Sequence, residues 1–192
     1  QLSGIPHLVL RRMPASASPW RAYALLIDAD ALASQARHEE AQEVLETLIA
    51  EFPEHRLAIP ANRLLAWTYA REGREDLAIA TEERMLELTC ERAGVEDGMD
   101  VLDLGCDWGS LSLWIAEHFP GASVTSVSNS SSQREFIMAQ AAGRGISNIE
   151  VIVADMNDFD IDKRFDRAVS VEMFEHMRNW EQIGRAPCRE RV

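Results

Sequence analysis

The sequence predicts an α/β protein preceded by an all-α region. Two observations lead to this prediction. Apolar residues recur at helical spacing through residues 21–84, and from Met99 onward short apolar strands alternate with amphipathic helices. Alternation of this kind is typical of βαβ units, which build a parallel sheet through right-handed crossovers. Residues 1–20, which contain three prolines, are expected to form a loose segment.

The all-α region is expected to contain four helices. Leu25, Leu26, Ala29, Leu32 and Ala33 share one helical face and define the first. The others are expected at residues 39–52, 57–71 and 76–88. Pro53 ends the second helix, because a proline disfavours helical backbone in the residue before it. Gly73 ends the third.

The α/β part is expected to alternate regularly between strands and helices. The strands are predicted at residues 101–104, 123–127, 149–154 and 168–171, and the helices at 109–118 and 131–144. In the second of these helices we expect Phe136, Ile137 and Ala141 to face inward, and glycines 143 and 145 to mark its end.

Composition narrows the possible partners. The chain of 192 residues has a net charge of −13, which argues against nucleic acid or an anionic membrane as the main partner. Cys90, Cys106 and Cys188 are far apart, without CxxC spacing, so neither a disulfide framework nor a metal site is expected. This cysteine usage fits a reducing cytoplasm. No apolar run approaches the roughly 18 residues of a membrane span.

Four polar loops follow the four predicted strands, at residues 105–110, 128–133, 155–157 and 172–176. In an open parallel sheet, ligands bind outside the carboxyl ends of the strands, where the strand order reverses. The four loops are therefore expected to converge on one ligand.

The first loop has the character of a nucleotide-type turn. Gly105 permits the turn, Gly109 lets the next helix approach closely, and Asp103 is expected to anchor the loop by accepting backbone N–H bonds. A tight turn without a ligand is the alternative. A Rossmann dehydrogenase is disfavoured, because the loop lacks GxGxxG spacing and no acidic residue closes the second strand.

These segments together carry a family resemblance. VLDLGCDWGSLSLWIAEHFPGASVTSVSNSSSQREFI, then NIEVIVADMNDF and FDRAVSVEMFEHM, resemble S-adenosylmethionine (SAM)-dependent methyltransferases of the cyclopropane-fatty-acid synthase group. The coclaurine N-methyltransferase-like branch is the most similar. The resemblance covers roughly residues 85–180 and implies a partial Rossmann-like class I methyltransferase sheet with four of the seven strands, in a domain at 85–182.

The resemblance implies roles for the residues of the first three loops. Gly105, Cys106 and Gly109 would line the methionine part of SAM. Ser128, Asn129 and Gln133 would hold the ribose. Met156 and Asn157 would flank the adenine, with Asp155 just before them. Gln133 has an alternative, because Ser130-x-x-Gln133 is also a capping box. From Asp158 onward we expect only a solvated acidic loop.

The fourth loop is expected to carry the chemistry through Glu172, Glu175 and His176. In the N-methyltransferase branch, the matching residues are implied to deprotonate and position the substrate amine. In the cyclopropane-synthase branch, the positions of Glu175 and His176 help to hold a bicarbonate that accepts a proton after methyl addition to an alkene. A cluster that only stabilises a helix start is the alternative.

Two features depart from the family pattern. Asp107 stands where the family has glycine, and it is expected to adopt left-handed backbone at modest cost. Its charge is expected to weaken SAM binding. The substitution Asp107→Gly would therefore tighten SAM binding. Residues 183–192 do not continue the pattern and resemble the translation of a sequencing adapter, which makes them a suspected non-native tail.

The expected function is methyl transfer from SAM to a small-molecule amine or a lipid alkene, in the cytoplasm. The alternative is a protein-binding adaptor joined to an inactive methyltransferase remnant. In that case the partner would bind the helices of residues 21–84, where AWTYAREGREDLA resembles tetratricopeptide repeats. Two such units cannot be aligned at a constant spacing of about 34 residues, so a helical lid remains equally open for this region.

Overall fold

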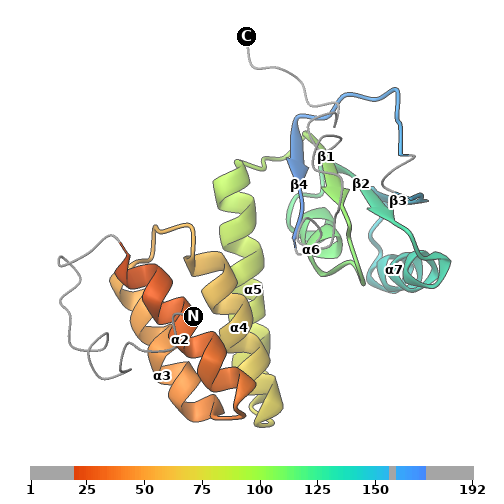
Figure 1. The fold of residues 1–192 in the computed structure, drawn as a ribbon. Helices are drawn as coiled ribbons and strands as arrows, with labels where there is room; N and C mark the ends of the chain where they lie inside the picture. The colour runs from red at the N-terminus through yellow and green to blue at the C-terminus, as the bar shows by residue number, and fades with distance from the viewer. Residues whose placement is uncertain (1–19, 156–158, 172–192) are drawn as a thin grey trace. The chain divides into compact units, whose positions relative to one another are not determined.

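The computed structural model of the chain describes residues 20–155 and 159–171 (Figure 1). The chain divides into two units, Gln1–Thr89 and Cys90–Val192, which are treated separately below. In the described part of the chain, no helix has the length and apolar character needed to cross a membrane.

The first unit is helical, as predicted. Its helices are α2 (Arg21–Ser34), α3 (His38–Glu51), α4 (Ala58–Arg71) and the greater part of α5 (Glu75–Ala93). Helix α3 packs between α2 and α4, and their facing sides form one core. The residues buried in that core include Leu25, Leu32, Leu45, Leu48, Ala61 and Leu65. The tetratricopeptide-like character of this unit stays a prediction.

One buried charge is paired inside the helical unit. Nε and Nη2 of Arg21 donate to the two carboxylate oxygens of Glu51, each at 2.7 Å, although Arg21 is only 4% exposed. The hydrogen bond from Arg21 lowers the pKa of Glu51, because it stabilises the carboxylate. This pair joins the start of α2 to the end of α3.

The second unit contains one parallel sheet. Its elements are β1 (Asp100–Leu104), α6 (Ser110–His118), β2 (Ser123–Ser128), α7 (Ser131–Arg144), β3 (Ile149–Val153) and β4 (Arg167–Val169). The strand order is β3-β2-β1-β4, and each neighbouring pair is parallel. The predicted α/β class is thereby confirmed, and the fourth strand lies beside the first.

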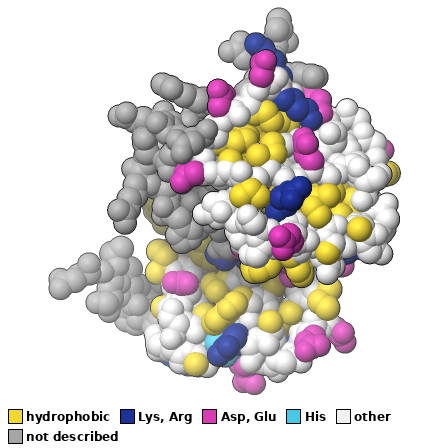
Figure 2. Space-filling model, turned by 90° about the vertical axis from the view of Figure 1, so that its right-hand side faces the viewer, with side chains coloured by type: hydrophobic (Ala, Val, Ile, Leu, Met, Phe, Trp, Pro, Cys, Tyr) yellow, Lys and Arg dark blue, Asp and Glu magenta, His cyan; other side chains and the backbone are white. Residues whose placement is uncertain are grey.

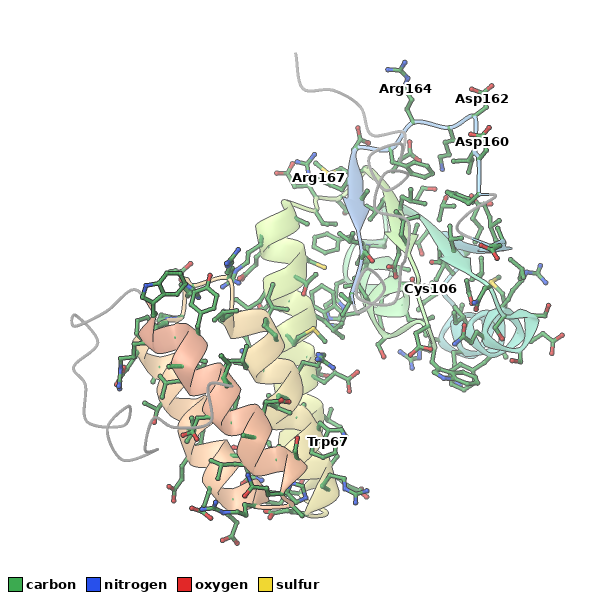
Figure 3. The ribbon with its side chains drawn as sticks, in the orientation of Figure 1. Trp67, Cys106, Asp160, Asp162, Arg164 and Arg167 are labelled. Atoms are coloured by element: carbon green, nitrogen blue, oxygen red, sulfur yellow. The ribbon has the colours of Figure 1, made fainter. Side chains whose placement is uncertain are left out.

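Three residues of the β3–β4 connection, Asp160, Asp162 and Arg164, lie away from the carboxyl ends of the strands. In Figure 3, Asp160, Asp162 and Arg164 lie toward the end of the sheet marked by Arg167, whereas Cys106 lies at the opposite end. All three side chains are exposed, as predicted. The prediction of only a solvated loop is wrong for Phe165, which is completely buried in a core with Leu102, Leu104 and Val127. At this amino end the Arg167 guanidinium donates to the carbonyl oxygens of Ala93 and Gly94, at 2.6 and 3.0 Å.

Candidate functional site

The loops that follow the four strands begin side by side. The amides of Gly105 and Cys106, after β1, both donate to the Val127 carbonyl of β2 at 3.0 Å. The Ala154 amide, after β3, donates to the Ser128 carbonyl at 2.9 Å. The Ser170 hydroxyl, after β4, donates to the Leu104 carbonyl of β1 at 2.8 Å. The strand order reverses between β1 and β4, so this edge is the usual ligand site of such a sheet.

The first loop is built from alternating residues with left-handed backbone. The φ angles are 77° at Gly105, 46° at Asp107 and 85° at Gly109. Aspartate visits this region at modest cost, and the expectation of left-handed backbone at Asp107 is confirmed. Gly109 is buried, and a Cβ atom there would lie 2.6 Å from Cγ1 of Ile137 on α7. Gly109 therefore lets the start of α6 approach α7 closely.

Asp103 lies beneath the loop in a buried polar network. Its carboxylate accepts a hydrogen bond from the Ser112 hydroxyl at 2.5 Å, and Ser126 donates to Ser112 at 2.7 Å. The sequence predicted backbone amides of the loop as donors to Asp103. The structure differs, because the amides of Gly105 and Cys106 are taken by a carbonyl of β2.

Burial raises the pKa of two side chains here, Asp103 and Cys106. It raises the pKa of Asp103 to about 6, although the Ser112 hydrogen bond opposes the shift. It also raises the pKa of the Cys106 thiol to about 12, and the nearby charge of Asp103 acts in the same direction. Cys106 is 7% exposed. At neutral pH it is a neutral, weakly polar wall of the loop and not a nucleophile.

Gln133 connects the first two loops through its side chain. Its amide Nε2 donates to Oδ1 of Asp107 at 2.6 Å, and its Oε1 accepts a hydrogen bond from the Ser128 hydroxyl. The Ser130 hydroxyl caps α7 by accepting from the Gln133 backbone amide. The Ser130 backbone amide donates to Oγ of Ser128, however, and not to the Gln133 side chain. Only the serine half of the capping box is formed.

The remaining predicted site residues divide into two groups. Asn129 and Asp155 are exposed at the carboxyl edge, directly after β2 and shortly after β3. The other predicted residues, Met156, Asn157, Glu172, Glu175 and His176, lie outside the described residues. Their roles stay predictions.

An exposed aromatic pair flanks the first loop and was not expected. Trp108 and Phe136 are 51% and 42% exposed, and their rings meet edge to face with centroids 5.3 Å apart. The prediction that Phe136 faces inward is wrong, whereas Ile137 and Ala141 are buried as predicted. The buried residues of α7 are Ile137 and Ala141. Phe136 comes one residue before Ile137, so its side chain points about 100° away from that of Ile137 around the helix axis. Figure 2 shows hydrophobic side chains exposed among charged ones on one face of the molecule.

Comparisons with known proteins match the part of the chain that carries these loops. Residues 66–183 match the family model described as mycolic acid cyclopropane synthetase. The (S)-coclaurine N-methyltransferase of Thalictrum flavum subsp. glaucum is 47% identical over 102 residues, which is 53% of this chain and 28% of that protein. The cyclopropane-fatty-acyl-phospholipid synthase of Escherichia coli (strain K12) is 36% identical over 98 residues, 51% of this chain and 24% of that protein.

A solved structure agrees with the fold. Coclaurine N-methyltransferase bound to N-methylheliamine and SAH superposes with a TM-score of 0.54 and 42% identity, covering 55% of this chain and 31% of that one. The chain thus spans less than a third of the length of these relatives. The family match itself extends over well more than half of the chain. With the parallel sheet and the loop geometry described above, it places the chain in the mycolic acid cyclopropane synthetase family of methyltransferase-like proteins.

Proposed function

We propose that the intact protein transfers a methyl group from SAM to a small-molecule amine. The contact that carries this proposal is the Gln133 side chain, which joins Ser128 after β2 to Asp107 after β1. A glutamine that served only the helix start would bond back to the Ser130 amide. The Gln133 side chain instead donates to Asp107 of the first loop, which supports a binding site shared by the first and second loops.

The described residues suit the parts of SAM that the family resemblance assigns to them. The left-handed turn at Gly105 and Gly109 leaves backbone without side chains beside the methionine position. Cys106, with its neutral thiol, adds a wall without charge. Asn129 and Gln133 offer amide groups for the ribose. Ser128, which the resemblance assigns to the same region, is buried and donates to Gln133, so it would act by orienting that side chain. Asp155, Met156 and Asn157 would adjoin the adenine. When bound, SAM supplies a methyl group activated by a sulfonium sulfur.

The acceptor side is assigned to the loop after β4. The Ser170 hydroxyl, directly after β4, donates to the carbonyl of Leu104 at the end of β1, so the described start of this loop lies beside the first loop. Glu172, Glu175 and His176 would bind the amine and take up its proton. Loss of that proton would free the nitrogen lone pair, and the same residues would hold it in line with the methyl carbon that SAM would supply.

An amine is favoured over a lipid alkene by the relatives. The proteins named N-methyltransferases include one 47% identical to this chain, compared with 36% for the E. coli synthase. The synthase and the family description favour the lipid alkene as the second candidate. In that reaction Glu175 and His176 would hold a bicarbonate as the proton acceptor.

The proposal is tested by binding and then by acceptor choice. Titration calorimetry with S-adenosylhomocysteine should show binding at one site. Transfer of a labelled methyl group is then measured to a cyclic secondary amine and to vesicles of unsaturated phospholipid. Labelled amine supports the proposal, and labelled lipid alone moves the acceptor to the second candidate. No binding of S-adenosylhomocysteine would contradict both.

Catalysis and binding are separated by one further variant. Glu172→Gln should lower methyl transfer by about 100-fold or more, the usual range for loss of a general base, while S-adenosylhomocysteine binds as before. Glu135→Gln, on the exposed side of α7, is the charge-matched control and should leave both properties unchanged.

A further inference from the structure

The end of β2 lacks the carboxylate that nucleotide-binding sheets of this type commonly place there. In such sheets an acidic residue after the second strand accepts hydrogen bonds from ribose hydroxyls. Here β2 ends at Ser128 and continues through Asn129 to Gln133, and the first acidic residue after it is Glu135. Glu135 is exposed on α7, one turn beyond the cap. The second loop therefore offers hydroxyl and amide groups but no charge.

A carboxylate reaches this place from the first loop instead. Oδ1 of Asp107 lies 2.6 Å from Nε2 of Gln133, although the two residues are 26 positions apart. Through Gln133 it is linked to Ser128, the last residue of β2. Left-handed backbone at Asp107, with φ of 46°, accompanies this contact.

Most of the accepting capacity of Asp107 remains available. An ionised carboxylate has about four lone-pair positions. Within residues 20–155 and 159–171, Gln133 is the one residue that donates a hydrogen bond to Asp107. The side chain is exposed. The amide of Gln133 thus orients one oxygen, and the other can accept from a ligand.

We propose that Asp107 is the ribose-binding carboxylate of this protein, supplied by the first loop in place of an acidic residue at the end of β2. This inference rests on the proposed function. The sequence predicts that the Asp107 charge weakens SAM binding. The inference predicts that the charge strengthens it, because the hydrogen bond from Gln133 holds the carboxylate on the side assigned to the ribose. A hydroxyl of that ribose donates to Asp107, and Gln133 fixes the carboxylate from the other side.

The test pairs a change in the protein with a change in the ligand. S-adenosylhomocysteine and its 2′-deoxy and 3′-deoxy derivatives are titrated into the wild-type chain, Asp107→Asn and Asp107→Gly. Hydrogen bonds to charged groups contribute enough for a roughly tenfold change in affinity, so both variants should bind S-adenosylhomocysteine about tenfold more weakly. Asparagine and glycine both accept left-handed backbone, and thermal unfolding checks that each variant is folded.

The ligand series separates a direct contact from a general effect of charge. For the deoxy derivative that lacks the contacted hydroxyl, wild type and Asp107→Asn should bind equally. Glu135→Gln removes a neighbouring charge and should change no affinity more than twofold. The inference alone would be overturned if the Asp107 variants bound S-adenosylhomocysteine as tightly as the wild type or more tightly. It would also be overturned if the variants lost the same factor of affinity for all three ligands. Absence of binding by the wild type would overturn the proposed function and the inference with it.

Discussion

A Cβ atom on Gly109 would lie 2.6 Å from Cγ1 of Ile137, and Ile137 is completely buried. Gly109 also has a φ of 85°. We predict that Gly109→Ala destabilises the α/β unit by about 2–5 kcal/mol. Left-handed backbone costs alanine roughly 1–2 kcal/mol, and overpacking against a buried side chain costs about 1–3 more. Urea unfolding measured by circular dichroism gives the change.

Gly143 is the matched control for this substitution. It lies in α7 without left-handed backbone, and a Cβ atom there would meet nothing within 4 Å. Gly143→Ala should therefore stabilise the protein by about 0.5–1 kcal/mol, because alanine loses less backbone entropy in a helix. Equal destabilisation by both substitutions would show that the approach of Gly109 to Ile137 is not the cause.

The buried carboxyl of Asp103 should make stability fall as pH rises from about 4 to about 6. Its pKa is raised from 3.8 to about 6 in the folded state, chiefly by burial. Between these values the folded chain binds the proton and the unfolded chain does not, so rising pH favours unfolding. Two pKa units correspond to about 3 kcal/mol.

Asp103→Asn isolates this effect, because an amide oxygen can still accept the Ser112 hydrogen bond and does not titrate. The free energy of unfolding is measured in urea at pH 4, 5, 6 and 7 for both proteins. The difference between variant and wild type should grow in favour of the variant as pH rises through this window. Parallel curves would contradict the raised pKa of Asp103.

The sequence predicted most elements, because their limits are set by local residues. Ser130 caps α7 and Gly145, with φ of 72°, ends it, and the predicted range 131–144 is the observed one. The strands follow from apolar runs, and their parallel pairing follows from the alternation of strands and helices. The left-handed residue at Asp107 was also predicted, because the family pattern has glycine there.

Contacts between segments could not be read from the same local signals. Asp103 accepts from Ser112, nine residues away, and Phe136 lies against Trp108 instead of the core. Helical periodicity predicts which residues share a face of a helix. It does not predict which neighbouring element covers the residues at the edge of that face. The bond from Gln133 to Asp107 likewise depends on how α7 approaches the first loop.

Cys106 should resist alkylation in the folded protein. Its pKa is raised to about 12 from 9.0, so the reactive thiolate is roughly a thousandfold scarcer than in the unfolded chain. Iodoacetamide at pH 8 should label Cys106 much more slowly than in urea, by roughly a thousandfold, as followed by mass spectrometry of its peptide. Equal rates in both conditions would place an accessible thiolate in the first loop.

Substitution of Ser130 should change the stability of the protein, whereas substitution of Gln133 should change ligand binding. Ser130 accepts the Gln133 backbone amide as a helix cap, so Ser130→Ala should lower the free energy of unfolding by about 1 kcal/mol. The Gln133 side chain bonds Asp107 and Ser128, so Gln133→Leu should weaken S-adenosylhomocysteine binding about tenfold, since hydrogen bonds to a charged group and to the ligand are lost. Calorimetric titration and urea unfolding are run on both variants, with Gln140→Leu as a control, since Gln140 lies on α7 away from its start. If Gln133→Leu lost stability and kept its affinity, Gln133 would belong to the helix start and not to the binding site.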